Sequence, residues 1–162
     1  MLDIDDATLR ERLHAALGVQ RWVDEVVARA PYASVNRLVE RGSAAAAQLT
    51  DAELDEAAGH HPRIGERASG DGTAQRLSAD EQGGLQRSSE GAEAEVARGN
   101  AVYEQRFGRV FLIRAAGRST DEIAAELQRR LKNTADDEAA EAKEQLRQIA
   151  ELRLRTLFEV DS

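Results

Sequence analysis

A histidine held beside a proline, together with a nearby group of polar side chains, is the part of this sequence best suited to chemistry. Residues 59–65 read Gly-His-His-Pro-Arg-Ile-Gly, and after a glycine-rich bridge residues 77–82 read Leu-Ser-Ala-Asp-Glu-Gln. Pro62 fixes its own φ and biases His61 toward an extended backbone, which restricts the directions open to the imidazole. Because an unperturbed histidine has a pKa of about 6.5, His61 can give or take a proton at neutral pH. We interpret it as a candidate general acid or base.

Ser78, Glu81 and Gln82 have both a functional and a structural interpretation. Ser-x-x-Glu is the pattern of a capping box, in which the hydroxyl and the carboxylate satisfy amides at a helix start. If the first turns after Ser78 are helical, these three side chains and Leu85 share one face at about 100° per residue. Polar groups beside a core leucine are what a pocket requires. The histidine pair can likewise be a polar helix terminus, so the spacing alone leaves both interpretations open.

The elements that would position these side chains are predicted to be helices. Ala, Leu, Glu and Arg dominate the sequence, whereas aromatic residues make up 4% and proline occurs twice, a composition that favours helix over sheet. The predicted fold is all-α, a single-domain compact bundle of about seven to nine helices with long loops, covering residues 1–162. The expected helices span 5–16, 20–30, 34–49 with an interruption near Gly42, 50–59, 78–107 with a break, 119–131 and 134–158.

Two further features concern the core and the backbone. Trp22 recurs with Val23 and Val26 at helical spacing, so packing in the core is its default explanation.

Residues 109–114 form a short apolar run that we expect to be an extended connector. Backbone amides and carbonyls that are not used in a helix or sheet must find other partners, and we expect those of the connector to be free to bind something.

Charge and cysteine content exclude several classes of protein. The net charge of −8 argues against nucleic-acid partners, because binding to phosphates needs a basic surface. No apolar run is long enough to span a bilayer, and we expect neither a membrane association nor a secretory leader or peroxisomal signal. The absence of cysteine rules out disulfides and thiolate catalysis and is compatible with a reducing cytoplasm. The expected location is cytoplasmic.

The two polar segments together resemble the signature of a known enzyme family. His-Pro-Arg-Ile-Gly, a short glycine-rich loop and Ser-x-x-Glu-Gln look like the motifs of the 2-oxo-4-hydroxy-4-carboxy-5-ureidoimidazoline (OHCU) decarboxylases of uric acid breakdown. One departure is that Arg109-Val110 stands where many members carry Phe-Pro. Further pieces of the resemblance are Arg21-Trp22, Pro31-Tyr32, Asn100-x-x-Tyr103-x-x-x-Phe107-Gly108-x-x-Phe111 and Leu152-Arg153-Leu154.

The resemblance implies an activity, a site and an assembly. The expected reaction is decarboxylation of OHCU, a small molecule, to (S)-allantoin, without a metal or an organic cofactor, by a homodimer. His61 and Glu81 match the catalytic pair of the family. The positions that match its substrate-binding groups are Pro62, Ser78, Gln82, the backbone near Ile113, and the side chain of Arg153.

The spacing of the last helix adds an expectation about Arg153. At about 100° per residue this arginine lies near the middle of an apolar stripe, whereas Arg155 points to the opposite side. A core-facing guanidinium is costly unless it is paired. It could pair with a buried carboxylate such as Glu81, extend its head to water, or donate hydrogen bonds to a substrate carboxylate or carbonyl. The stripe consists of Leu146, Ile149, Ala150 and Leu157.

Two alternative functions belong to other classes. The first is a metal-dependent hydrolase that uses His60, His61 and carboxylates, for which His14 is the remaining imidazole. Full activity after treatment with a chelator would exclude it. The second is a non-catalytic helical interaction module with an acidic surface, which would explain the helices but not the co-occurrence of both polar segments with the downstream motifs.

Overall fold

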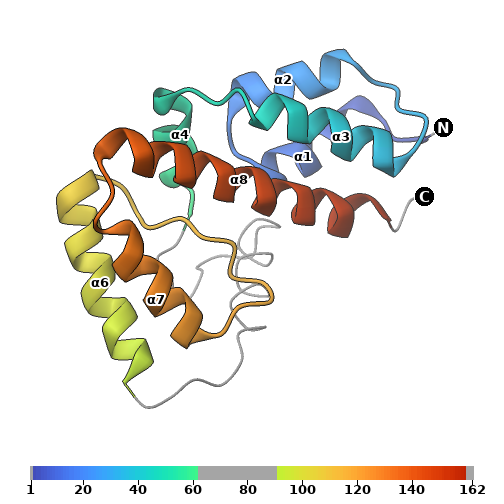
Figure 1. Ribbon diagram of the computed structural model, residues 1–162. Coiled ribbons are helices and arrows are strands. Elements are labelled where there is room, and N and C mark those ends of the chain that lie inside the picture. The colour runs from blue at the N-terminus through green and yellow to red at the C-terminus, as the bar shows by residue number, and fades with distance from the viewer. Residues whose placement is uncertain (1, 62–90, 160–162) are drawn as a thin grey trace. The chain divides into compact units, whose positions relative to one another are not determined.

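The described part of the protein is helical. The computed structural model describes residues 2–61 and 91–159 (Figure 1), and seven helices lie in these two ranges. The prediction of an all-α fold is confirmed. The helices are α1 (Asp6–Ala16), α2 (Gln20–Ala28), α3 (Val35–Ala46), α4 (Asp51–Ala58), α6 (Ala92–Phe107), α7 (Thr120–Arg130) and α8 (Ala135–Phe158).

Five of the seven described helices start at a side-chain cap. Asp5 Oδ1 accepts a hydrogen bond from the Thr8 amide at 2.8 Å at the start of α1. At the start of α4, Thr50 and Glu53 form a capping box, with reciprocal bonds of 3.0 and 3.1 Å. Each such cap satisfies amides that have no partner inside the helix. The same role is played by Ser34 for α3, Ser119 for α7 and Thr134 for α8.

Two helix ends differ from the prediction by a few residues. α2 ends at Ala28 rather than at residue 30, where the amides of Arg29 and Ala30 bond to Val26 O and Val27 O, three positions earlier, at 3.2 and 3.0 Å. α3 ends at Ala46 rather than at residue 49. There the amides of residues 48 and 49 bond to carbonyls only three positions earlier, at 3.2 and 3.3 Å, and such tightened turns are common where a helix stops.

The predicted interruption of α3 near Gly42 is wrong, because this glycine is a packing contact inside a continuous helix. A Cβ at Gly42 would lie 2.7 Å from Leu154 Cδ1 and 3.3 Å from the Trp22 ring. The Trp22 Nε1–H also donates to Gly42 O at 2.8 Å. The glycine therefore lets the fully buried indole and leucine approach the α3 backbone, which outweighs its low helix propensity of about 1 kcal/mol relative to Ala. Trp22 is a core residue, as expected.

The chain divides into two compact units, Met1–Ala57 with Lys143–Ser162, and Ala58–Ala142. The prediction that 1–162 form one domain stays a prediction. In the first unit, α1, α2 and α3 pack together with the C-terminal part of α8 (Figure 1). Arg21 of α2 also forms a two-pronged ion pair with Glu53 of α4, with N···O distances of 2.8 and 2.9 Å.

The second unit is built on α6 and α7, which lie side by side (Figure 1). A core of apolar side chains from α6, α7 and the segment between them includes fully buried Tyr103, Ile123 and Leu127. α6 ends at Phe107 and is followed by Gly108, whose φ of +74° lies in the left-handed region that glycine adopts without strain. Residues 109–118 then run without helix to α7, as the extended connector predicted. None of the helices in 2–61 and 91–159 has the length and apolarity to cross a bilayer.

Candidate functional site

His61 stands directly after α4, where the helix has already ended. Its amide donates to Ala58 O at 3.2 Å, which closes the turn formed by Gly59 and His60. His61 is partly buried, whereas His60 is exposed. Of the two adjacent imidazoles, His61 is therefore the one that the fold partly withdraws from water. The catalytic role of His61 stays a prediction.

The partners predicted for His61 lie outside the described residues. These positions are Pro62, Ser78, Glu81 and Gln82, together with the glycine-rich segment 65–74. The catalytic pairing of His61 with Glu81 accordingly stays a prediction, as do the binding roles of the other three residues. The same holds for the alternative in which Ser78 and Glu81 form a capping box.

Ile113 lies in the connector between α6 and α7, and this connector is buried rather than solvated. Phe111, Leu112 and Ile113 are 2%, 2% and 4% exposed. The expectation that the backbone groups of the connector are free is wrong for two carbonyls. Leu112 O accepts a hydrogen bond of 2.8 Å from Arg130 Nη1, and Arg114 O accepts one of 2.9 Å from Arg118 Nε. In both cases an arginine side chain provides the partner that a backbone carbonyl outside a helix requires. Ile113 is described, and its role in substrate binding stays a prediction.

Arg153 occupies the core-facing side of α8, as its spacing predicts. Arg153 is 5% exposed, and its Nη1 donates a hydrogen bond to Ala15 O at 3.3 Å. Ala15 is in the last turn of α1, where carbonyls lack partners within the helix and where the helix dipole favours a cation. By contrast, Arg155 is exposed and donates to Asn36 Oδ1 at 3.0 Å. The burial of Arg153 disfavours the alternative in which its head extends into water.

A buried ionic cluster in the second unit was missed by sequence reasoning. Arg130 and Glu138 are 1% and 0% exposed, and the Arg130 Nε–H donates to both carboxylate oxygens at 3.0 and 3.1 Å. The Tyr103 hydroxyl donates to the same carboxylate, and burial, followed by this contact, raises the pKa of Tyr103 above its usual range. A signal was present in the spacing, because Arg130 continues the apolar stripe of Ile123 and Leu127 on α7. A charge on such a stripe indicates a buried partner.

Several residues that carry the resemblance build this cluster and its surroundings. The Tyr103 ring lies 4.8 Å from that of Phe107 and 5.2 Å from that of Phe111, the latter edge-on. The guanidinium of Arg130 lies 4.4 Å from the centroid of the Phe111 ring. Such contacts stabilise through packing and through attraction of the cation to the ring face. The Tyr-Phe-Phe pattern is therefore a support for the connector.

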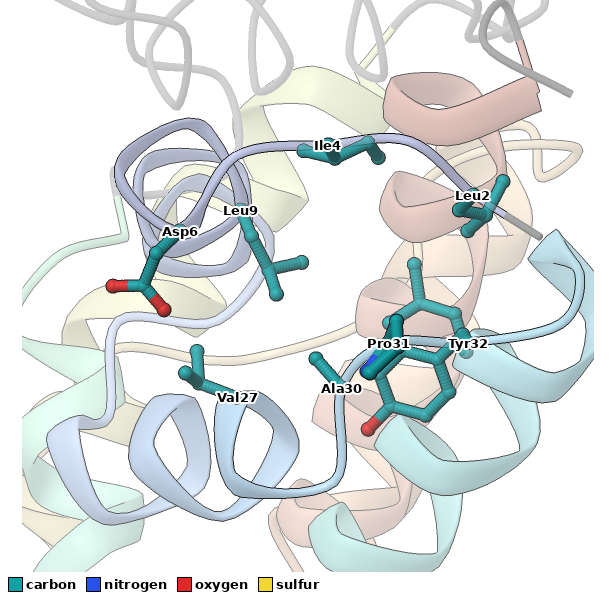
Figure 2. Close-up of a pocket in the computed structure, with 9 residues that line it drawn as sticks. Leu2, Ile4, Asp6, Leu9, Val27, Ala30, Pro31 and Tyr32 are labelled. Carbon is teal, nitrogen blue, oxygen red and sulfur yellow. The ribbon is translucent and has the colours of Figure 1, made fainter.

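A pocket of about 270 Å³ lies in the first unit, among residues 2–38. Most of its lining residues are of apolar type, Leu9, Val27 and Pro31 among them, and the segment holding Leu2 and Ile4 runs across it (Figure 2). The Tyr32 hydroxyl, which could have bound a ligand, donates to Val26 O at 2.6 Å. Of the predicted site residues in the described part of the chain, which are His61, Ile113 and Arg153, none lines this pocket, so we do not assign the chemistry to it.

Comparison with known proteins identifies the family. The sequence profile of OHCU decarboxylase matches residues 3–155. The fold is similar to a crystal structure of OHCU decarboxylase in the presence of (S)-allantoin, with a TM-score of 0.75 and 23% identity, over 92% of this chain and 98% of that one. It is also similar to a crystal structure of (S)-allantoin synthase, with a TM-score of 0.66 and 16% identity, over 95% of this chain.

The (S)-allantoin synthase is the longer protein, and this chain spans 51% of it. No curated protein matches the sequence. The two structural likenesses establish the fold, and the profile match extends from before α1 to within the last turn of α8. It thereby includes His61 and the other residues on which the resemblance in the sequence rests. This chain belongs to the OHCU decarboxylase family.

Proposed function

We propose that this protein decarboxylates OHCU to (S)-allantoin, without a cofactor, in the breakdown of uric acid. The observation that carries the proposal is the match of the OHCU decarboxylase profile to residues 3–155. The placement of His61 at a partly buried helix end and of Arg153 on the buried face of α8 supports it.

The substrate itself explains why no cofactor is required. Decarboxylation leaves an electron pair behind, and many enzymes use a cofactor to accept it. In OHCU the carbon that carries the carboxylate and the hydroxyl adjoins a C=N carbon. When the bond to the carboxylate breaks, its electron pair forms a C=C bond between these two carbons, and the C=N electrons move to nitrogen, which takes a proton. Protonation of the second carbon and loss of the hydroxyl proton then give allantoin.

The protein has to supply orientation and proton transfer. In the proposed mechanism His61 contacts the hydroxyl and carboxylate and turns the breaking C–C bond into line with the C=N system, while Glu81 handles the proton at the second carbon. Delivery of that proton to one face gives a single enantiomer of the product. Ser78 and Gln82 hydrogen-bond the ureido and ring amides, and Pro62 shapes the turn that holds His61. The backbone near Ile113 and the side chain of Arg153 complete the site.

A guanidinium suits the role proposed for Arg153. OHCU presents a carboxylate and carbonyl oxygens, and the planar guanidinium can donate two parallel hydrogen bonds to such groups. Burial strengthens these bonds, because the protein interior screens charge less than water does. The contact with Ala15 O at 3.3 Å limits the movement of the guanidinium before the substrate arrives.

The assembly and the location follow from the family and the composition. We propose a homodimer in the cytoplasm that has no nucleic-acid or membrane partner. The acidic net charge of −8 and the absence of cysteine support this proposal. Light scattering during size-exclusion chromatography tests the dimer: a mass twice that of the 17.7 kDa chain supports it, and a monomer mass contradicts it.

The activity is tested by following CO2 release from OHCU generated freshly from uric acid with the upstream enzymes. The wild-type protein should accelerate release, and the acceleration should persist after dialysis against a chelator. Glu81→Gln keeps the size and hydrogen-bonding shape of the side chain, so it separates catalysis from capping. Activity should fall by about 10² to 10⁴-fold with little change in Tm. An active variant that melts several degrees lower would mean that Glu81 is a cap.

A further inference from the structure

The buried Arg130–Glu138 pair does more than neutralise two charges inside the second unit. Arg130 Nε and Nη2 face the Glu138 carboxylate, while Nη1 turns away from it and donates to Leu112 O at 2.8 Å. One side chain thus joins α7 and α8 to the connector. Burying two charges costs several kcal/mol before their attraction is counted, and hydrophobic side chains of the same size often serve stability equally well. Stability alone therefore does not explain the choice of an arginine.

The guanidinium is fixed on three sides. The Phe111 ring covers one face, with 4.4 Å between Arg130 Cζ and the ring centroid. The Glu138 carboxylate is itself held by the Tyr103 hydroxyl and by Asn133 Nδ2, the latter at 3.2 Å. Because the carboxylate cannot turn, the planar guanidinium that faces it cannot turn either, and its Nη1 keeps one direction. A lysine ammonium has neither the planarity nor the second donor needed for this arrangement.

The contact with Leu112 O sets the direction of the Ile113 N–H. The carbonyl of Leu112 and the amide of Ile113 belong to one peptide unit, which is planar and trans. In a trans peptide the C=O and N–H bonds point in opposite directions, so fixing the carbonyl toward Arg130 aims the amide away from it. Within 2–61 and 91–159, no backbone carbonyl accepts a hydrogen bond from the Ile113 amide. A buried amide requires a partner, and Ile113 is 4% exposed.

We propose that Arg130 is a positioning residue for the substrate, which acts by holding the Leu112–Ile113 peptide so that the Ile113 N–H donates to an oxygen of OHCU. The inference rests on the proposed function, because it concerns the same site. Arg130 itself does not touch the substrate. Arg130 acts only by orienting the Leu112–Ile113 peptide through its hydrogen bond to Leu112 O. Loss of this hydrogen bond should weaken substrate binding more than it slows the chemical step.

The decisive variant is Arg130→Lys, which keeps a positive charge beside Glu138 but loses the donor to Leu112 O. The matched control is Arg129→Lys, the same change at the neighbouring position, where the side chain is exposed and pairs with Glu126 and Glu141. A second control is Tyr103→Phe, which removes a hydrogen bond from the buried cluster and leaves the contact between Arg130 and Leu112. It reports the effect of loosening the cluster without releasing the peptide.

Steady-state kinetics with fresh OHCU, at a temperature where every variant is folded by circular dichroism, give the first readout. Arg130→Lys should raise KM by about tenfold with kcat within about threefold, as expected for a lost binding contact. Both controls should keep KM within about twofold. The second readout is titration with (S)-allantoin, followed through the ¹⁵N resonance of the Ile113 amide. That resonance should shift in the wild type and in both controls, and much less in Arg130→Lys.

Arg130→Met combined with Glu138→Leu covers the case in which the lysine variant does not fold. This pair removes both charges, which buried sites often tolerate, and it also removes the donor to Leu112 O. It should show the same rise in KM. An unchanged KM in a folded Arg130 variant overturns the positioning role and leaves the proposed function standing. A wild-type protein that does not accelerate OHCU decay overturns the proposed function, and the substrate role of the peptide with it.

Discussion

Replacing Arg153 by Lys separates the contribution of this residue to folding from its contribution to catalysis. Within the described structure its guanidinium donates to Ala15 O at 3.3 Å, a long hydrogen bond. A net hydrogen bond contributes about 0.5–1.5 kcal/mol, so we expect the unfolding free energy to fall by about 1 kcal/mol. For a chain of this size, that change lowers Tm by about 2–4 °C. The charge is retained, which avoids a larger loss.

The kinetic effect should be larger than this structural effect. If Arg153 donates two hydrogen bonds to the substrate, a lysine can replace at most one of them with the same geometry. We expect kcat/KM to fall by about tenfold or more, which corresponds to about 1.4 kcal/mol or more of transition-state stabilisation. The measurement is the initial rate of OHCU loss at several substrate concentrations, at a temperature where the variant is fully folded.

Arg155→Lys is the matched control for this prediction. Arg155 lies two positions along the same helix, its side chain is 45% exposed, and its contact with Asn36 is on the surface. Exposed contacts of this kind contribute little, so both kcat/KM and Tm should stay close to those of the wild type. Near-wild-type kinetics for Arg153→Lys, or a larger kinetic loss for Arg155→Lys, would refute the placement of Arg153 in the substrate site.

Three further predictions test the proposed role of His61, the packing at Gly42 and the ion pair of Glu53. His61→Asn should lower activity by about 10² to 10⁴-fold with an unchanged helical spectrum, and His60→Asn much less; equal losses would mean that the turn collapsed or that the wrong imidazole was chosen. Gly42→Ala should lower the unfolding free energy by about 1–2 kcal/mol, because overpacking exceeds the gain in helix propensity; a stabilised variant in urea unfolding would contradict the packing argument. The pKa of Glu53 is lowered to about 2, mainly by its hydrogen bonds with Arg21, so its stabilisation is present above pH 4.5 and is lost as pH falls from 4.5 toward 2. The unfolding free energies of wild type and Glu53→Gln should therefore differ by about 1 kcal/mol at pH 6 and converge near pH 2, and a constant difference would argue against the pair.

Local patterns allowed most helix starts to be predicted, because the information lies within a few residues. The capping box of Thr50 and Glu53 is an example: each side chain bonds the amide of the other residue, and no distant contact is needed. The same applies to Asp5 and Ser119. The exposed Arg155 and the buried Arg153 were also placed correctly, because their two-residue separation on a helix puts them on different faces.

Tertiary contacts explain what local patterns could not predict. Gly42 looked like a helix break because glycine has a low helix propensity, and its close contacts come from Trp22 and Leu154, far away in the sequence. The role of Arg130 depends on Glu138 and on Leu112, which lies eighteen residues before it. The spacing of α7 could have shown that a charge was buried there, but it could not have shown which backbone carbonyl the arginine holds.

The candidate site was predicted from the spacing of residues on the last helix and from the resemblance to the OHCU decarboxylases. The structure describes only some of the residues concerned. His61, Ile113 and Arg153 lie in the described part of the chain, and the burial of Arg153 agrees with its spacing. Residues 62–90 contain the remaining predicted positions and lie outside that part. The family assignment rests on the profile match over 3–155, and the pairing of His61 with Glu81 is tested by kinetics.

The chirality of the allantoin formed from fresh OHCU tests the central claim most directly. OHCU decays without an enzyme to racemic allantoin, whereas an enzyme that protonates one face of the intermediate gives one enantiomer. The wild-type protein is added at a concentration at which the catalysed rate far exceeds the spontaneous rate. We then expect rapid formation of (S)-allantoin, detected by circular dichroism or chiral chromatography. His61→Asn should return the product toward the racemate. Racemic allantoin formed at the spontaneous rate in the presence of the wild-type protein would contradict the account.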